Sequence, residues 1–312
     1  MDALVPEIEV GAGIPIQRHS AWHRVRKNLG VRMGGIVLLL LAIASILAPW
    51  LGTVDPTLLD PTNRDLLPGA SGEIMQLTGE SLPHTFWMGT DSYGRDIYSR
   101  VLYGGRISLV VGITVAALSL AIGLVIGLAA GYVRWLDSVV MRIMDGMMAI
   151  PGILLAIALV SLWHASLLTV IVAITIPDIP RVTRLVRSLV LSIREEPYVE
   201  AAVSVGTPTF KLLYRHVLPN TLAPLIVQGT YLCALAILVE AGLSFLGVGL
   251  PADVPTWGNI MAEGRLQFNQ YPHNVFFPGI FLALTVLAVN MLGDGLRDTL
   301  DPRFNKRGDR PA

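Results

Sequence analysis

Charged residues are scarce in this sequence. Only 15% of its 312 residues are charged, while 53% are hydrophobic, whereas about a quarter of the residues in soluble domains are charged. Lysine plus arginine equals aspartate plus glutamate at 23 each, so no basic excess indicates a nucleic-acid partner. We therefore expect a protein whose main solvent is lipid and which binds no nucleic acid.

Cysteine is nearly absent as well. The chain has a single cysteine, Cys233, so no disulfide can form within it. Cys233 lies inside an apolar run, which favours a small buried apolar side chain. The six histidines are scattered without repeated metal-ligand spacing, so we expect no metal site.

The sequence also lacks motifs for ATP hydrolysis and for intramembrane catalysis. No G-x-x-x-x-G-K-[ST] phosphate loop, H-E-x-x-H or G-x-S-x-G motif occurs. Gly293-Asp294-Gly295 does not make an aspartyl protease site without a second positioned aspartate. We expect no catalytic residue and no cofactor bound by this chain.

Long apolar runs are what the sequence does contain. A helix needs about 20 mostly apolar residues to cross the hydrocarbon core, because lipid offers no partner to exposed backbone groups. These runs predict an all-α integral membrane protein with six transmembrane helices. The six stretches are Gly34 to Gly52, Ile107 to Val133, Ser138 to Trp163, Ala165 to about Val190, Thr221 to about Gly249, and Val275 to about Gly293.

The first stretch has a second interpretation. Basic residues precede it, and Ala42 and Ala44 have the small-x-small spacing of a signal-peptide cleavage site. The apolar run continues beyond Ala44, and more than thirty residues come before it. We therefore expect it to remain as a membrane anchor.

Basic residues are unevenly divided between the two faces that six spans create. Eighteen lie on the face that carries both termini, and five lie on the other. The positive-inside rule then predicts that both termini are cytoplasmic. The predicted divisions are a cytoplasmic tail 1–33, a first transmembrane helix 34–52, an extracytoplasmic loop 53–106, a core domain 107–297 of five transmembrane helices with an inward loop 191–220, and a cytoplasmic tail 298–312.

Acidic residues interrupt the apolar runs and need an explanation, since a carboxylate at membrane depth is costly. We expect Asp145 to pair with Arg142, three residues earlier on one helix face, and Asp294 to pair with Arg297. Asp178 lies between two prolines that predict a kink. Asp178 and Glu240 are therefore candidates for a translocation path. For each there is a structural alternative, namely an ion pair with Arg181 or Arg184 for Asp178 and a hydrogen bond between helices for Glu240.

A stripe of small residues marks the second span. Gly123, Gly127 and Gly131 repeat every four residues, which allows another helix to approach closely. The partner helix belongs either to the same chain or to another subunit, and the spacing does not distinguish between them.

The inward loop predicts two short helices. Pro197 suits a first helical position, Gly206 a stop, and Thr207-Pro208 a cap and restart, while Pro219 is expected to end the second helix. On that helix Phe210, Leu213 and Val217 follow three- and four-residue steps. They predict an apolar ridge suited to docking.

The same loop carries a family resemblance. Glu200-Ala201-Ala202, Gly206 and Leu218-Pro219 resemble the E-A-A motif of binding-protein-dependent ABC transporter permeases. The usual isoleucine two residues before Leu-Pro is replaced by His216. Further segments are similar to the "C" type subunit of dipeptide and oligopeptide permeases: Gly89-Thr90-Asp91, Gly94-Arg95-Asp96, Ser99-Arg100, Gly104, Arg106 to Leu109, Ser244 to Gly249, Pro255 to Gly258, Gly293 to Asp298, and Asp301-Pro302.

The resemblance implies a type I ABC importer permease fold in the cell inner membrane. It also implies a homologous second permease, two ATPase subunits that use ATP and magnesium, an extracytoplasmic binding protein, and a peptide or a related substrate such as glutathione or a nickel complex. The implied ATPase-coupling residues are Glu200, Ala201, Ala202, Gly206, Phe210, Leu213, Leu218 and Pro219.

Two other functions compete with this one. A self-contained secondary transporter or channel would use Asp145, Asp178 and Glu240 as an ion path, but no inverted repeat is visible. An intramembrane enzyme would need one of the motifs that are absent. Both are less favoured than a permease subunit.

Overall fold

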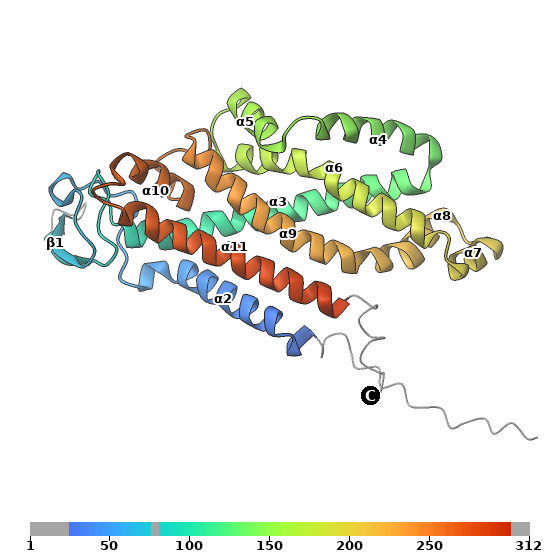
Figure 1. Cartoon of the computed structure of the whole chain (residues 1–312), viewed down its shortest axis with the longest axis horizontal. Helices are drawn as coiled ribbons and strands as arrows, with labels where there is room; N and C mark the ends of the chain where they lie inside the picture. Colours follow the sequence, from blue (N-terminus) through green and yellow to red (C-terminus); the bar gives the residue numbers. More distant parts are fainter. Residues whose placement is uncertain (1–24, 76–80, 301–312) are drawn as a thin grey trace, which may run out of the picture.

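The computed structural model describes residues 25–75 and 81–300. Most of the predicted tails, 1–33 and 298–312, lies outside the described residues. The long helices run side by side along one axis (Figure 1). They are α2 (Leu29–Ile46), α3 (Ile97–Tyr132), α4 (Arg134–Met148), α6 (Leu167–Ile193), α9 (Leu218–Phe245) and α11 (His273–Leu300). A shorter helix, α5 (Gly152–Leu162), does not share this direction.

Short elements occupy the two ends of this bundle. One end, here named the cap end, carries α10 (Trp257–Gly264) and an antiparallel hairpin of β1 (Ala70–Met75) and β2 (Ser81–Phe86). The opposite end, the loop end, carries α7 (Pro197–Ser204) and α8 (Thr209–Leu212). Figure 1 shows that α2 begins and α11 ends toward the loop end. The start of α2, the end of α11 and the predicted inward loop therefore lie toward the same end of the bundle.

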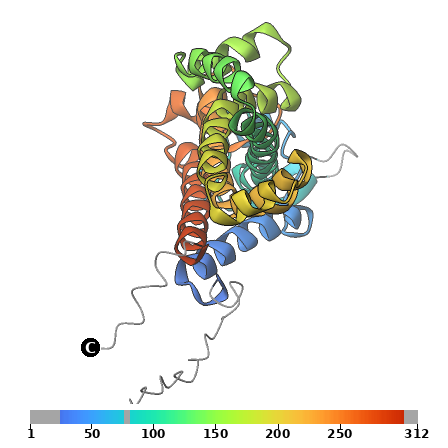
Figure 2. The ribbon, with the colours of Figure 1, turned by 90° about the vertical axis from the view of Figure 1, so that its right-hand side faces the viewer.

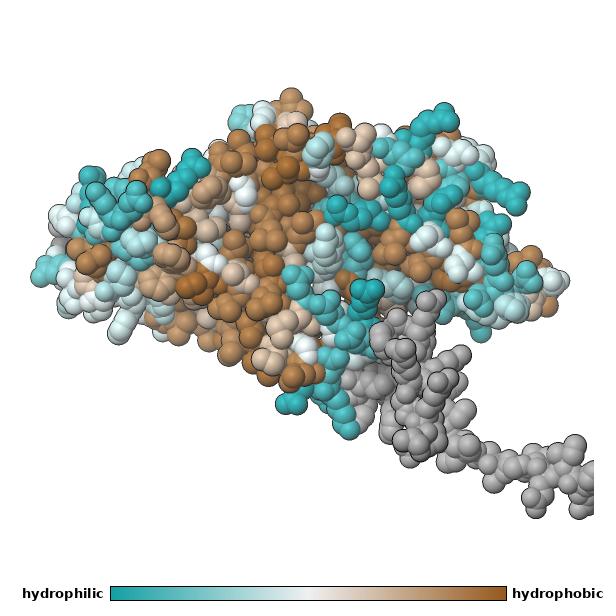
Figure 3. All heavy atoms as spheres, in the orientation of Figure 1, coloured by the Kyte–Doolittle hydropathy of each residue, from teal (hydrophilic) through white to brown (hydrophobic). Residues whose placement is uncertain are grey.

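The surface has the polarity pattern that a bilayer-crossing protein requires. In Figure 3, apolar side chains form a band across the middle of the bundle, with hydrophilic side chains toward both ends. Within the described ranges, four helices are long and apolar enough to cross a membrane: α2, α3, α11 and a helix of 37 residues, Thr209–Phe245, which contains α8 and α9. The bent pair α4 and α5 makes a fifth span if it is counted as one.

α6 is the remaining long helix. Its 27 residues include Asp178 and three arginines, so it is long enough to span but too charged to qualify by composition. The chain is a multi-pass helical membrane protein, and the predicted six transmembrane helices are compatible with the structure. The hairpin is an addition that hydropathy does not reveal.

The prediction of one helix from Ser138 to Trp163 is wrong. The structure divides this stretch into α4 and α5, which are bent by 87° relative to each other. Pro151 explains the break, because it has no N–H and disfavours helical backbone at Ile150. α4 lies along the bundle, and α5 lies across it (Figure 1).

Three helices begin or end outside their predicted bounds. α2 begins at Leu29, where the Asn28 side chain accepts a hydrogen bond from the amide of Val31 at 3.2 Å. α3 begins ten residues before the predicted Ile107, with Asp96 as its N-cap, and α11 runs on to Leu300. Hydropathy detects only the part of a helix that lies in lipid, whereas capping side chains decide where a helix starts.

The glycine stripe brings α3 against α6 of the same chain. A Cβ atom added to Gly123, Gly127 or Gly131 would lie 2.5, 2.6 or 2.7 Å from the Cβ atom of Val182, Val186 or Val190, respectively. No side chain fits at such a distance, so the two backbones approach closely along three turns. The three valines are fully buried.

Replacing Gly127 with leucine should loosen this contact. Overpacking a close-fitting interface costs about 1–3 kcal/mol, so we expect the G127L variant to unfold in detergent at a lower temperature than the unmodified protein. Gly35→Leu on α2 is the matched control, since no atom lies within 4 Å of its added Cβ. Equal unfolding temperatures for the two variants would contradict the close α3–α6 contact.

Candidate functional site

The predicted coupling loop protrudes from the loop end of the bundle. α7 begins with Pro197 in its first turn, where a missing N–H is not needed. Val199 is buried and anchors the helix, while Glu200 and Ala201 are exposed and Ala202 is half-buried. No described side chain pairs with the Glu200 carboxylate, so α7 exposes a free carboxylate and a small apolar surface.

Gly206 ends α7 in a left-handed conformation, with φ at +82°. The amide of Gly206 donates to the carbonyl of Val203 at 2.8 Å, and the amide of Thr207 donates to that of Ala202 at 3.1 Å. This pair of bonds is the Schellman motif, which requires glycine or a strained residue at this position. The turn therefore fixes the direction in which the chain leaves α7.

The second short helix does not end at Pro219, contrary to prediction. A π-helical turn, Leu213–Val217, joins α8 to α9, and the Leu218 amide donates to the Leu213 carbonyl five residues earlier. Proline has no N–H to donate within a helix. The wider turn before Pro219 accommodates this missing hydrogen bond, so the helix continues through the proline. α8 is therefore continuous with α9 and forms one helix with it, Thr209–Phe245.

The predicted apolar ridge on this helix is wrong in part. Phe210 is 82% exposed, but Val217 is fully buried and Leu213 packs against the core cluster of Val186 and Val190. The exposed apolar surface consists instead of Phe210 together with Val205 at 87% and Tyr214 at 67%. Leu213 and Val217 do share one side of the helix, but that side packs against the bundle and is not open for docking.

Tyr198 braces the loop against α9. The Asn220 amide donates to the Tyr198 hydroxyl at 3.1 Å and to the His216 carbonyl at 2.7 Å. Burial raises the pKa of the Tyr198 phenol, and the negative charge of Glu196 raises it further. The phenol is therefore neutral near pH 7 and can accept the Asn220 hydrogen bond.

The two candidate path acids are engaged within the chain. Asp178 is buried and pairs with Arg181 at 3.1 Å, while α6 continues through both of its prolines. Glu240 is fully buried, accepts from Ser244 at 2.9 Å, and lies 3.4 Å from the Ser108 hydroxyl of α3. These contacts agree with the structural alternatives, an ion pair for Asp178 and a hydrogen bond between helices for Glu240. Both carboxylates contact side chains of the same chain.

The predicted pairing of Asp145 with Arg142 is wrong. Asp145 pairs with Arg184 of α6, and Asp137 binds Arg187 of α6 through both carboxylate oxygens, one of them at 2.6 Å. α4 and α6 are thus joined by two cross-helix ion pairs. The predicted Asp294–Arg297 pair is also not among the ion pairs of the described residues, and both side chains are exposed.

A buried ion network at the cap end was not predicted as a site. Arg95 binds Asp91 at 2.7 Å, and Arg100 binds Asp91 at 2.6 Å and Glu263 at 2.5 Å. Arg95 also reaches Glu263. Two arginines and two carboxylates neutralise one another and fasten α10 to the start of α3. The run Asp91 to Arg100 signalled this network by its charge density, but its partner Glu263 is remote in sequence.

The motif glycines shape the same end. Gly94 has φ at +77° and approaches the Asp60 carbonyl too closely for any side chain, while Gly247 has φ at +81° and ends α9. Gly258 lies against Ala241 and Ser244 of α9, and Trp257 donates to the Val101 carbonyl at 3.0 Å. The segments that carried the resemblance are therefore close contacts between helices.

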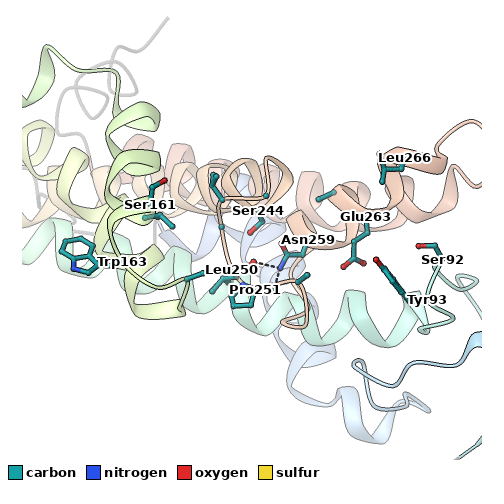
Figure 4. Close-up of a pocket in the computed structure, with 17 residues that line it drawn as sticks. Ser92, Tyr93, Ser161, Trp163, Ser244, Leu250, Pro251, Asn259, Glu263 and Leu266 are labelled. Atoms are coloured by element: carbon teal, nitrogen blue, oxygen red, sulfur yellow. Dashed lines mark hydrogen bonds between the residues drawn. The ribbon is translucent and has the colours of Figure 1, made fainter.

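A cavity of about 520 Å³ opens beside this network. The end of α5, the loop 247–252, α10 and Tyr93 surround it, and Figure 4 shows Glu263 and Tyr93 at one side with Trp163 at the other. Asn259 donates to the carbonyls of Pro251 at 2.9 Å and Val254 at 3.0 Å. These bonds hold the loop that forms the wall.

Comparisons with known proteins agree over nearly the whole chain. A family model described as the binding-protein-dependent transport system inner membrane component matches residues 107–306, and one described as the N-terminal transmembrane domain of oligopeptide transport permease C matches residues 17–68. A probable peptide ABC transporter permease of Sinorhizobium fredii is 49% identical over 292 residues, which is 94% of this chain and 95% of that protein.

Two further relatives have different named substrates. A dipeptide transport system permease of Alkalihalophilus pseudofirmus is 42% identical over 286 residues, covering 91% of this chain and 90% of the relative. A glutathione transport system permease of Pectobacterium atrosepticum is 40% identical over 285 residues, with the same coverage of both chains.

Removing one carboxylate from the cap-end network should destabilise the protein. Glu263→Gln would leave Arg95 and Arg100 buried with one negative partner instead of two, and breaking a buried ion pair costs about 3–5 kcal/mol. We expect a lower unfolding temperature in detergent. Glu73→Gln on the exposed side of the hairpin is the control, and an equal effect of both changes would contradict a structural role for the network.

Proposed function

Because this chain belongs to the family of binding-protein-dependent transport system inner membrane components, we propose that it is one of two permease subunits of an ATP-powered peptide importer. The other permease is a homologous chain, and the translocation path runs between the two. The observation that carries the proposal is the exposed α7, whose residues match the E-A-A motif and whose helical neighbour α8 continues into α9.

Energy comes from separate ATPase subunits, since this chain has no phosphate loop. Each ATPase subunit binds ATP and magnesium, and one of them receives α7 in a groove. Ala201 allows close packing there, Gly206 sets the turn, and Glu200 supplies a carboxylate for a cationic or backbone partner. Closure of the ATPases then pushes α8 and α9 as one body.

The chain lies in the cell inner membrane with both termini in the cytoplasm. The excess of lysine and arginine on the face of the termini supports this orientation, and α7 lies at the same end of the bundle. The cap end with its hairpin and α10 then faces outward. An extracytoplasmic binding protein delivers substrate to it.

The substrate is a short peptide or a related molecule such as glutathione. Relatives named for peptide, dipeptide and glutathione transport support this class, and the binding protein makes most of the selection within it. A self-contained secondary transporter is not favoured, because Asp178 and Glu240 are paired inside the chain and not arranged along an open ion path.

A bulky residue on α7 should block coupling. Ala201 is exposed in the chain alone, so Ala201→Trp can clash only with a partner, and an overpacked contact of about 1.4 kcal/mol or more lowers coupling about tenfold. We expect ATP-dependent peptide uptake into vesicles to fall by that factor. Leu39→Trp on the lipid-facing side of α2 is the size-matched control, and equal uptake by the two variants would exclude the coupling role of α7.

The purified single chain should neither hydrolyse ATP nor transport peptide, because both activities need the partner subunits. We expect ATPase activity and peptide uptake in proteoliposomes only when the second permease and the ATPases are reconstituted with it. Gradient-driven peptide uptake by the single chain would favour the secondary-transporter alternative.

A further inference from the structure

The cavity at the cap end has one charged side chain in its lining, and that side chain is an acid. Of the 17 described residues that surround this space of about 520 Å³, Glu263 of α10 is the only one with a charged side chain. In Figures 1 and 2, α5, whose end forms one wall, lies on the side of the bundle opposite α2. A cavity lined by one sign of charge concentrates ligands of the other sign, so this one favours a cation.

The Glu263 carboxylate has one oxygen available to such a ligand. Its Oε2 atom accepts from Arg100 at 2.5 Å and also from Arg95. Its Oε1 atom has only the Nη2 atom of Arg100, at 3.5 Å, which is too long for a strong hydrogen bond. The two arginine side chains are 7% and 1% exposed and that of Glu263 is 16% exposed, so the cavity reaches the carboxylate and not the arginines.

Tyr93 adds a second acceptor beside this carboxylate. Figure 4 shows Tyr93 and Glu263 on the same side of the cavity, with the Tyr93 hydroxyl directed toward the carboxylate. The Tyr93 amide donates to Asp91 at 2.9 Å, and the Arg95 guanidinium lies 4.7 Å from the centre of its ring, so the side chain is held at this place. A primary ammonium has three N–H donors. Glu263 and Tyr93 can accept two of them.

An unpaired backbone group lies on another wall of the cavity. Gly249 is buried and lines the cavity, but neither its amide nor its carbonyl makes a hydrogen bond within the described chain. A buried peptide group without a partner is costly. A Cβ atom on Gly249 would lie 2.3 Å from the hydroxyl oxygen of Ser244, so a larger residue would not fit there. A ligand with a peptide group of its own can supply the missing partner.

The rest of the lining is mainly apolar. Its largest apolar members are Val160, Trp163, Val248, Leu250 and Leu266. Figure 4 shows Trp163 at the side opposite Glu263. The volume falls within the range of about 300–1,000 Å³ that is usual for small-molecule sites. The cavity therefore combines an acid at one side with apolar walls beyond it.

We infer that this cavity binds the free amino terminus of a short peptide at the outward end of the chain. The ammonium group binds Glu263 and Tyr93, a peptide group pairs with Gly249, and the side chains of the peptide lie against the apolar walls. This inference rests on the proposed function and narrows its substrate class. Glutathione has a carboxylate on the same carbon atom as its amino group, and no cation lines the cavity to bind it. The site therefore selects α-peptides over glutathione.

Photolabelling of the assembled importer tests this inference. The probe is alanyl-benzoylphenylalanine, a dipeptide with a free amino terminus, and the sample is the purified complex of both permeases and the ATPases without the binding protein. We expect the label on this chain within residues 160–165 and 244–266. Alanyl-phenylalanine should compete at a concentration at least about tenfold lower than N-acetyl-alanyl-phenylalanine or glutathione, because acetylation removes a hydrogen bond between charged groups.

A lysine beside Glu263 should have the same effect as acetylation of the peptide. Ser92 lines the cavity and makes no hydrogen bond within the described chain, so Ser92→Lys adds a competing cation without removing a contact. We expect photolabelling to fall about tenfold. Asn269→Lys adds the same charge at an exposed position of the cap end outside the lining, and it should be labelled as strongly as the unmodified chain.

The contrary results separate this inference from the proposed function. Equal competition by the free and acetylated dipeptides, equal labelling of the two lysine variants, or a label confined to other segments would overturn the inference. The proposed function would then still stand if the importer, supplied with its binding protein, takes up dipeptide with ATP. Absence of ATP-dependent peptide uptake by the complete importer would instead overturn the proposed function.

Discussion

Hydrocarbon offers no hydrogen-bond partner to a polypeptide backbone, and the architecture of this chain follows from that constraint. The long helices satisfy their own amides and carbonyls, and their start sites are fixed by side chains such as Asn28 and Asp96 that accept from first-turn amides. In lipid there is little hydrophobic driving force for helices to associate, so association depends on the close packing that small residues allow. The three glycines of α3 against the valines of α6 supply it.

One continuous helix links the two ends of the molecule. The helix Thr209–Phe245 begins in the predicted coupling loop and ends at the cap end, where Gly247 terminates it. Near that end, Glu240 and Ser244 are hydrogen-bonded, and Gly258 of α10 lies directly on the helix. The helix therefore joins α8 to α10 and the wall of the cavity without an irregular segment between them.

Much of this could be predicted from the sequence. Apolar run length predicts the membrane class, and the family resemblance, carried by residues such as Glu200 and Gly206, is confirmed by the matching family models. Both properties depend on local sequence. The turn at Gly206 was likewise readable, since a left-handed residue after a short helix favours glycine.

The wrong predictions have two physical origins, local backbone geometry and contacts between elements that are remote in sequence. The break at Pro151 lies inside an apolar run, and hydropathy averages across it. The π-helical turn before Pro219 continues the helix past the proline that was expected to end it, and no periodic pattern records this local geometry. Asp145 prefers Arg184 over Arg142, and Glu263 joins Asp91 through two arginines. Such pairings depend on which helices lie side by side in the fold. The spacing of residues along the chain does not specify this.

The whole account requires that α7 and the hairpin lie on opposite sides of the membrane, with α7 in the cytoplasm. Cysteine accessibility tests this directly in a Cys233→Ala background, with Val205→Cys beside α7 and Glu73→Cys in the hairpin, both at exposed positions. In intact cells, a membrane-impermeant maleimide should label position 73 and should reach position 205 only after the inner membrane is opened. Labelling of position 205 from outside intact cells would place α7 beyond the reach of any ATPase and would contradict the account.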